Sequence, residues 1–432
     1  MGIYYGMNGL WVPVSGQGSF IRLSKINIVS PPTKTSYKHG EQFSSAGMTV
    51  RATYSNGDTM MVTNFTCLPN RALKFTDEKI TVVYTENGIT RRTEQSISVG
   101  SPVIITDIRQ LSYTYNLKGC GKYNNQYLMV GNDASWNIYG TIAPVSGDVS
   151  DFKMNVSGTY PAAGMLVTDT RIDIPLTNKY GGTLYKDRYK IALTVSDFLA
   201  KKQGFQVTSG ASIRMNCITE GGNGYIYTGG QTTNGASYIA YVSKSEAVTT
   251  NPTALNLGSY GEIIDIASCK DSAGASHLAA LTENSKILHK DLNTNGGLSG
   301  SDITDFSNVV KVGILPDDAH TYRSTFVYKD SNNFYLTSVN PGNLTKTSRP
   351  EITSGNSTIL GVGAIDNYAI VVFADATGNA KIYINEDWEN GKTYSLNALA
   401  PLAMCKIPNG IGVICKTSTT NTLVIKEITL AA

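Results

Sequence analysis

The stretch Ser212–Ser243, SIRMNCITEGGNGYIYTGGQTTNGASYIAYVS, has an apolar run, a glycine-rich turn, a second apolar run, another turn and a tyrosine-rich run. Short apolar runs separated by Gly and Asn turns are typical of antiparallel strands. The same order returns in stretches that begin near residues 111, 263, 309, 359 and 402. From residue 212 onward the starts are 43 to 51 residues apart. That spacing suits one four-stranded propeller blade of about 40–50 residues.

About seven such blades fit between residue 101 and the C-terminus, with six as the alternative. The interval from 111 to 212 holds two of them and contains a predicted helix over Val195–Phe205, with Ser196 as N-cap and Gly204 as its stop. A blade buries its faces only against neighbours, so the array must close. We expect residues 422–430 to complete a blade that begins near Val103. The rival arrangement is two or three separate sandwiches.

The composition predicts an all-β chain of two or three domains. Of 432 residues, 41% are hydrophobic and 16% are charged, which supplies packed cores and argues against disorder. The net charge of +3 comes from basic residues in runs of at most two, so we expect no nucleic-acid partner. No apolar run approaches the ~20 residues of a membrane helix, and the N-terminal stretch lacks a secretory signal pattern. We therefore expect no membrane partner.

The six cysteines contain no CxxC pair, so a zinc knuckle is not expected. Four of them lie in apolar, strand-like runs, and we expect free thiols that pack as small hydrophobic groups. A two-residue Asn409-Gly410 turn would pair residue 405 with residue 414, which disfavours a disulfide between Cys405 and Cys415. Chains without committed disulfides usually fold in a reducing cytoplasm.

Residues 24–100 have a different pattern of strands and sharp turns. In residues 47–63, GMTVRATYSNGDTMMVT, alternate residues of the first strand are apolar and Ser55–Asp58 is a hairpin turn. A second hairpin is predicted across Asn87-Gly88. Two hairpins and a leading strand in about 75 residues fit a β-sandwich.

This segment resembles the bacterial immunoglobulin-like domains, group 3 in type, of surface and phage proteins. The resemblance rests on an opening motif, a Gly-hydrophobic-x-Val strand, a Tyr-x-x-Gly turn and a closing Val-x-Tyr-x-x-x-Gly strand. It implies an immunoglobulin-like sandwich that acts as a spacer or adhesive module. The matching residues are Pro32, Thr33, Lys34, Tyr37, Gly40, Glu41, Phe43, Gly47, Met48, Val50, Tyr54, Gly57, Val82, Tyr84 and Gly88.

Residues 1–23 are interpreted as a docking arm. The segment YYGMNGLWVPVSG, residues 4–16, has aromatic residues, no partner strands of its own and a flexible end. Its Tyr-x-Gly-x-Asn-Gly-hydrophobic motif is similar to leaders of phage virion proteins. An exposed aromatic arm needs a surface to bury it, so we expect Tyr4, Tyr5, Leu10 and Trp11 to contact a neighbouring subunit. The alternative is a frayed terminus or a hairpin laid on the adjacent domain.

One loop has the pattern of a calcium site. In DLNTNGGLSGSD, residues 291–302, the side-chain oxygens of Asp291, Asn293 and Asn295 precede Gly296, and Asp302 stands where a closing Glu is usual. A strand precedes the loop instead of a helix. An Asn- and Gly-rich turn without metal is the alternative, and no other cofactor is expected.

No catalytic motif is present in the sequence. HExxH, GxSxG, P-loop and sialidase-box patterns are absent, and the four histidines are isolated. We therefore predict a protein that is not an enzyme. Six aromatic residues are weighed as sugar platforms, with strand core or sheet face as the leading interpretation. They are Trp136, Tyr225, Tyr227, Tyr238, Tyr241 and Trp388.

Together these features lead us to expect a structural attachment protein of a tailed-phage virion, assembled in the host cytoplasm as part of an oligomer. The arm binds other virion proteins, the immunoglobulin-like domain is a spacer, and residues 101–432 bind a host-surface glycan or protein. A capsid-decorating head fibre is the nearest alternative. A glycan-cleaving propeller enzyme and a bacterial surface adhesin are the alternatives of other classes.

Overall fold

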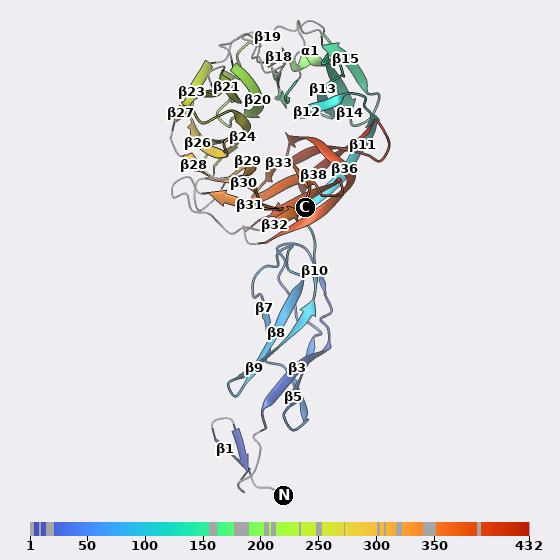
Figure 1. Cartoon of the computed structure of the whole chain (residues 1–432). Coiled ribbons are helices and arrows are strands. Elements are labelled where there is room, and N and C mark those ends of the chain that lie inside the picture. The colour runs from blue at the N-terminus through green and yellow to red at the C-terminus, as the bar shows by residue number, and fades with distance from the viewer. Residues whose placement is uncertain are drawn as a thin grey trace. The chain divides into compact units, whose positions relative to one another are not determined.

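The computed structural model describes residues 4–7, 10–13, 21–154, 162–176, 190–202, 207–208, 213–232, 235–247, 253–271, 273–299, 303–305, 308–316, 322–339, 351–386 and 390–431. The chain divides into two compact units. Unit 1 is Met1–Val103 with Ala431–Ala432, and unit 2 is Ile104–Leu430. The described regular structure is almost entirely β-strand, as the sequence predicted (Figure 1).

Unit 2 contains five antiparallel sheets of four or five strands within its described ranges, which we call blades 1 to 5. Blade 1 is β12 (Asn116–Tyr123), β13 (Gln126–Asn132), β14 (Ile138–Pro144) and β15 (Ser150–Met154). Blade 2 is β16 (Leu166–Val167), β17 (Arg171–Pro175), β18 (Lys190–Thr194) and β19 (Val207–Thr208). Blade 3 is β20 (Ile213–Glu220), β21 (Tyr225–Thr232), β22 (Ser237–Ser243) and β23 (Thr253–Gly258).

Blades 4 and 5 continue the series. Blade 4 is β24 (Ile263–Lys270), β25 (Ser276–Thr282), β26 (Lys286–Leu292), β27 (Leu298–Ser299) and β28 (Ile303–Asp305). Blade 5 is β29 (Val309–Pro316), β30 (Tyr322–Asp330), β31 (Asn333–Val339) and β32 (Glu351–Ser354). The first strands begin within a residue or two of the starts expected near 212, 263 and 309.

A seven-stranded sheet holds the last two blades. Its members are β33 (Thr358–Ile365), β34 (Tyr368–Ala374), β35 (Asn379–Asn385), β36 (Gly391–Ile407), β37 (Gly410–Lys416), β38 (Thr422–Leu430) and β11 (Val103–Ser112). Strand β36 pairs first with β35 and then with β37, and Leu399 lies where it changes partner. Strand β36 is thus the outer strand of blade 6 and the inner strand of blade 7. The described sheets give seven blades, the number that the repeat spacing favours over six.

The blades close into a ring. The inner strands β12, β16, β20, β24, β29, β33 and β36 contact one another in chain order, and β36 contacts β12. Strand β11 precedes blade 1 in the chain but lies beside β38 as the outer strand of blade 7. The prediction that residues 422–430 complete a blade begun near Val103 is therefore confirmed. Figure 1 shows the blades of unit 2 arranged around a common centre.

A shared bulge marks the inner strands of blades 1, 3, 4, 5, 6 and 7. The residue before each bulge is apolar and buried. These residues are Leu117, Met215, Ile263, Val309, Ile359 and Pro401. Glycines on the same strands admit side chains of the next blade. A Cβ on Gly121 would lie 2.3 Å from Val167, and one on Gly313 would lie 2.7 Å from Val362.

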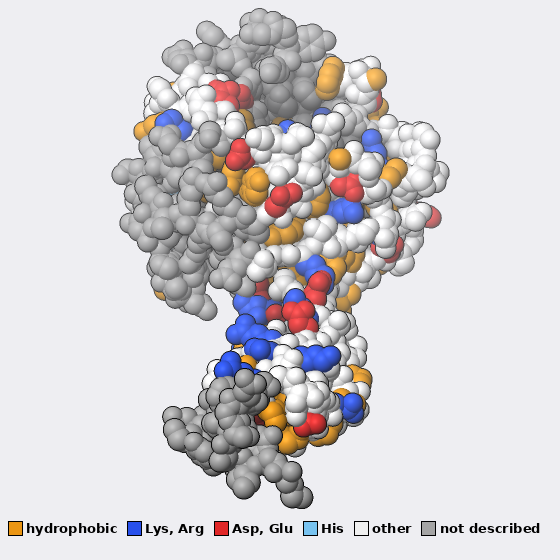
Figure 2. Space-filling view, turned by 60° about the horizontal axis from the view of Figure 1, so that its bottom comes forward, with side chains coloured by type: hydrophobic (Ala, Val, Ile, Leu, Met, Phe, Trp, Pro, Cys, Tyr) orange, Lys and Arg blue, Asp and Glu red, His pale blue; other side chains and the backbone are white. Residues whose placement is uncertain are grey.

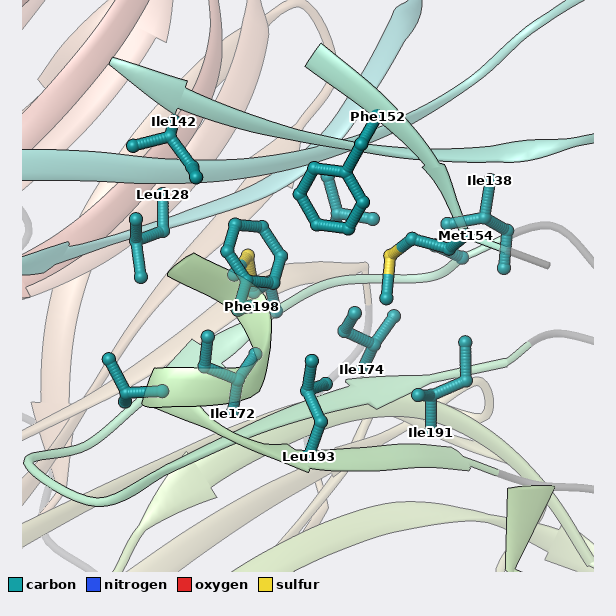
Figure 3. Packing of buried hydrophobic residues seen from close by; sticks show 14 of the residues in the cluster. Leu128, Ile138, Ile142, Phe152, Met154, Ile172, Ile174, Ile191, Leu193 and Phe198 are labelled. Carbon is teal, nitrogen blue, oxygen red and sulfur yellow. The ribbon is translucent and has the colours of Figure 1, made fainter. Parts of the chain in front are cut away.

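Blades 1 and 2 and the helix α1 (Val195–Leu199) share one core (Figure 3). Phe198 of α1 packs edge-to-face on Phe152 of blade 1, with 5.0 Å between ring centroids.

The prediction of the helix ends was wrong. Thr194 is the N-cap, because its side chain accepts a hydrogen bond from the Asp197 backbone N–H, and the helix ends at Leu199. Gly204 lies outside the described residues.

A buried ion pair ties blade 2 to blade 3. The side chains of Arg171 and Asp173 are 2% and 0% exposed. Nε and Nη2 of Arg171 donate to the two Asp173 carboxylate oxygens at 2.8 and 3.0 Å. Nη1 donates to the backbone carbonyls of Ser243 and Glu246, both at 3.2 Å. The guanidinium therefore contacts the carboxylate on its own strand and the end of strand β22 at once.

Unit 1 contains two three-stranded antiparallel sheets. One is β3 (Leu23–Ser30), β5 (Thr49–Tyr54) and β6 (Thr59–Val62), and the other is β7 (Thr66–Leu68), β8 (Lys79–Glu86) and β9 (Ile89–Ser96). Strands β4 (Ser36–Tyr37) and β10 (Ser98–Val99) form a short parallel pair. Val50 and Val82, one from each sheet, lie in one core. The two hairpin turns lie where predicted, whereas the immunoglobulin-like type remains a prediction.

Two local predictions were wrong. Residues 4–13 do have partner strands, because β1 (Tyr4–Met7) pairs with β2 (Leu10–Pro13) as a hairpin. The turn after β36 is Pro408-Asn409, which places Cys405 opposite Gly412 instead of residue 414.

The six cysteines are free, as predicted. Burial raises the pKa of the Cys415 thiol to about 12.

Candidate functional site

A pocket of about 510 Å³ lies over the seven-stranded sheet of unit 2. Two strands of blade 6 and two strands of blade 7 contribute to it, together with the loop between β37 and β38. Its lining is rich in hydroxyl and amide groups and contains no aromatic side chain. The lining residues are Asp107, Gln110, Asn379, Lys381, Ser395, Asn397, Ala398, Leu399, Thr417, Ser418, Val424 and Lys426.

The pocket lies where strand β36 leaves one blade for the next. Lys381 lies opposite Ser395 and Asn379 lies opposite Leu399, so the stretch between Ser395 and Leu399 is longer than its partner. Asn397 takes a left-handed backbone conformation with φ of 48°, and its backbone N–H donates to Ser395 Oγ at 3.0 Å. Asn tolerates this conformation better than most residues. The two extra residues form a bulge in β36, and the residues of that bulge line the pocket.

Charges in and beside the pocket are paired. Lys426 Nζ donates to a carboxylate oxygen of Asp107, and its side chain is only 3% exposed. Lys381 Nζ lies 3.3 Å from a carboxylate oxygen of Asp375. Burial pushes the pKa of Asp375 upward, but hydrogen bonds from Thr377, Asn379 and Lys381 outweigh it and hold that pKa at about 2. The cations are therefore neutralised within the protein.

This arrangement suits binding of a neutral polar ligand. Hydroxyl and amide groups both donate and accept hydrogen bonds, while Leu399 and Val424 add apolar surface. The volume falls within the roughly 300–1,000 Å³ of small-molecule sites. Asp107 is the one carboxylate among the lining residues, and it is paired with Lys426. The two carboxylates that glycoside hydrolysis ordinarily uses are not brought together in this lining.

The predicted calcium loop forms the turn between β26 and β27. Asp291 Oδ1 lies 2.8 Å from His277 Nδ1, and Asn293 Oδ1 accepts from Ser299 Oγ at 3.1 Å. Asn295 Oδ1 accepts from the Gly297 backbone N–H at 3.0 Å. The three oxygens expected on calcium thus have partners within the protein. Asp302 lies outside the described residues, so the metal site stays a prediction.

The same loop packs on tyrosines that the sequence offered as sugar platforms. Asn223 Nδ2 of blade 3 donates to the Asn293 carbonyl at 2.7 Å, and Tyr227 Oη donates to the Gly296 carbonyl at 3.1 Å. Tyr225 and Tyr241 lie beside Gly296, where an added Cβ would come within 2.7 Å of either ring. These three tyrosines therefore belong to the contact between blades 3 and 4. Trp388 lies outside the described residues.

The predicted docking residues lie on the N-terminal hairpin. Tyr4 lies opposite Pro13, Tyr5 opposite Val12, Trp11 opposite Gly6 and Leu10 opposite Met7. Their side chains are outside the described part of the structure, so the docking role stays a prediction. No helix in the described ranges is long and apolar enough to cross a membrane.

Figure 2 shows Lys and Arg side chains gathered on the visible face of unit 1, whereas the described part of the visible face of unit 2 is mostly uncharged. Residues 21–103 contain ten Lys or Arg against six Asp or Glu, and the whole chain has a net charge of only +3. The basic excess therefore belongs to unit 1, and unit 2 is close to neutral. The low net charge of unit 2 and the paired lysines of the pocket both favour an uncharged ligand over an ionic one.

Comparison with known proteins defines the class of fold. No family model and no curated protein matches the sequence. Among solved structures, the BP39L lectin of Burkholderia pseudomallei is 11% identical with a TM-score of 0.52, covering 74% of this chain and 97% of that chain. The WD40 domain of Toxoplasma gondii coronin is 11% identical with a TM-score of 0.51, covering 76% and 87%. A chain of the mitotic checkpoint complex is 13% identical with a TM-score of 0.51, covering 76% and 96%.

These likenesses show the fold alone, since the identities are low. They are consistent with the ring of blades in unit 2, and the chain carries a β-propeller-like all-β fold. The pocket had no signal in the sequence. Its residues come from strand ends and turns rich in Ser, Thr and Asn, which this chain has in many places. Only the pairing of β11 with β38 brings Asp107 and Gln110 to the other lining residues.

Proposed function

We propose that this chain is an attachment protein of a tailed-phage virion whose propeller binds a hydroxyl-rich ligand, such as a host-surface glycan, in the pocket between blades 6 and 7. The observation that carries the binding role is the lining of that pocket. Its amide and hydroxyl groups converge from both blades, and its cations are already paired. A neutral sugar offers the matching set of donors and acceptors.

The virion role rests on the sequence. The N-terminal motif and the immunoglobulin-like pattern of unit 1 both resemble segments of phage proteins, and residues 4–13 pair as a hairpin of their own. A hairpin with aromatic residues ahead of a folded unit supports docking on a neighbouring virion subunit. In this proposal unit 1 is a spacer, and the propeller is the part that meets the host.

Binding is favoured over cleavage for this pocket. A glycosidase ordinarily needs an acid and a second carboxylate on either side of the scissile bond. The lining supplies Asp107, whose charge is matched by Lys426. A propeller that holds a glycan without cutting it is consistent with this composition.

The test is binding of the full-length chain to bacterial surface polysaccharides, measured by biolayer interferometry. Ser418→Trp places an indole on the exposed rim of the pocket, whereas Thr419→Trp puts the same group on the next residue of the loop, outside the lining. We expect Ser418→Trp to abolish binding and Thr419→Trp to leave it unchanged. Equal binding by both variants would contradict the assignment of the pocket. Release of reducing ends from the polysaccharide would favour the enzyme alternative.

A further inference from the structure

Trp136 has a backbone conformation that its residue type disfavours. It lies in the loop Asp133–Asn137 between β13 and β14, with a φ of 64°. The Asp133 backbone N–H donates to the Asn137 carbonyl, and the Trp136 N–H donates to the Asp133 carbonyl, both at 3.1 Å. These two bonds define a hairpin loop in which the fourth residue is left-handed. Glycine is the usual residue at that position.

The protein contains the same loop with glycine elsewhere. The two backbone hydrogen bonds recur in five other loops of the described chain, and the fourth residue of each is a glycine with φ of 84° to 90°. Residues 375–379 of blade 6, DATGN, differ from DASWN of blade 1 chiefly in having Gly378 where Trp136 stands. The glycines of the five loops are Gly57, Gly224, Gly274, Gly296 and Gly378.

Side chains around Trp136 hold the loop in this conformation. Asp133 Oδ1 accepts from the backbone N–H groups of Ser135 and Asn137, both at 2.9 Å. The buried Asn132 donates from Nδ2 to the Trp136 carbonyl at 3.3 Å and accepts from the Ala162 N–H at 3.1 Å. The loop is thus fixed by its polar residues, and the indole is not needed to form it.

A large part of Trp136 is open to solvent. The residue is 41% exposed. At Gly378, the matching position of blade 6, an added Cβ would meet no atom within 4 Å. A strained residue with an exposed ring, at a position where glycine fits, points to a role outside the fold.

The other aromatic side chains near Trp136 in the sequence stack on each other. Tyr115 stacks on Tyr139 of β14 at 4.2 Å between ring centroids, with 14° between the ring planes. Among the described residues of blade 1, Val145 is the other large apolar side chain that is exposed, and it follows the far end of β14. The indole is therefore an isolated flat apolar surface. A protein interface ordinarily needs an apolar core within about 800 Å² on each partner.

We propose that Trp136 is a stacking platform for the ring of one neutral pyranose in a glycan. The choice of a glycan rests on the proposed function. In a propeller the loops between second and third strands lie at one end, and the corresponding loops of blades 6 and 7 supply Asn379, Thr417 and Ser418 to the pocket. Tyr113, which precedes blade 1, donates its backbone N–H to the Asn421 carbonyl of the blade 7 loop at 2.7 Å. A glycan that enters the pocket thus has Trp136 on the adjacent blade.

The experiment titrates the full-length chain in solution with methyl glycosides of glucose, galactose, mannose, N-acetylglucosamine and rhamnose. Trp136→Gly restores the residue of the matching loop, and Trp136→Phe keeps an aromatic ring. We expect Trp136→Gly to melt at the same or a higher temperature and to bind at least ten-fold more weakly. Trp136→Phe should lie between Trp136→Gly and the unmodified chain. In a Trp11→Phe/Trp388→Phe background, the bound glycoside should quench the fluorescence of Trp136.

The outcomes separate this inference from the proposed function. Unchanged affinity of Trp136→Gly, together with loss of binding in Ser418→Trp, would overturn the platform and leave the pocket standing. A lower melting temperature of Trp136→Gly would assign the indole to packing and overturn the inference. Loss of binding in Trp136→Gly alone supports the platform and counts against the pocket. If no glycoside binds the unmodified chain, the glycan ligand is wrong for both sites.

Discussion

Removing Arg171 should destabilise the propeller far more than removing the whole ion pair. Arg171→Met removes the two guanidinium hydrogen bonds that the Asp173 carboxylate accepts, and that carboxylate is 0% exposed. Breaking a buried pair in this way typically costs about 3–5 kcal/mol. The double variant Arg171→Met/Asp173→Leu removes both charges and takes the guanidinium away from the carbonyls of Ser243 and Glu246. We expect the double variant to lose about 1–2 kcal/mol, since an unmade hydrogen bond costs roughly that amount.

The assay is equilibrium unfolding in urea, followed by tryptophan fluorescence and far-ultraviolet circular dichroism, with a thermal melt as a check. At about 2–4 °C per kcal/mol, the single variant should melt on the order of 10 °C lower than the unmodified chain. Asp173→Leu alone should also be worse than the double variant, because it leaves the buried guanidinium without its carboxylate. A single Arg171→Met variant within about 1 kcal/mol of the unmodified chain, or a double variant less stable than it, would refute this reasoning.

Three further predictions concern local structure. Gly378→Trp should cost about 1–2 kcal/mol in urea unfolding, because it forces a bulky residue into the left-handed conformation, whereas Trp136→Gly should be neutral or stabilising. Because the pKa of Asp375 is held at about 2, below the ~3.9 of an unfolded chain, its stabilisation is present above about pH 4 and is lost as the pH falls toward 2. Asp375→Asn should therefore flatten the fall of the urea midpoint over that range, and an unchanged slope would contradict this. Thr194→Ala should cost about 1 kcal/mol and Thr194→Ser much less, and equal losses would argue against the observed N-cap.

Spacing predicted the propeller because each blade is a local unit. The expected starts near 212, 263, 309 and 359 coincide with the first strands of blades 3 to 6, since the hairpins within a blade need only neighbouring residues and Gly or Asn turns. Ring closure followed from the need to bury the blade faces. Registers were harder to predict. The turn after β36 is Pro408-Asn409, because Ile407 pairs with Gly410. The helix cap is Thr194 instead of Ser196, because β18 runs on to Thr194, which pairs with Arg171, and the helix begins at the next residue.

The candidate sites lay largely beyond sequence reasoning. The pocket gathers residues as far apart as Asp107 and Lys426, and only the pairing of the first propeller strand with the last brings them together. The sequence marks Trp136 only as an aromatic residue. Its strain is seen in the structure, where its φ is positive at a loop position that five other loops fill with glycine. The tyrosines of blade 3 carried a stronger aromatic pattern, yet they pack against the turn at Gly296.

The proposed attachment role is tested most directly by cryo-electron microscopy with immunogold labelling of virus particles purified from the source of this chain, using antibody to residues 101–432. Label at the tail or at a fibre tip is the predicted result, because it places the propeller where the host surface is met. Label spread over the capsid would replace attachment with decoration. Particles without label would contradict a role in the virion.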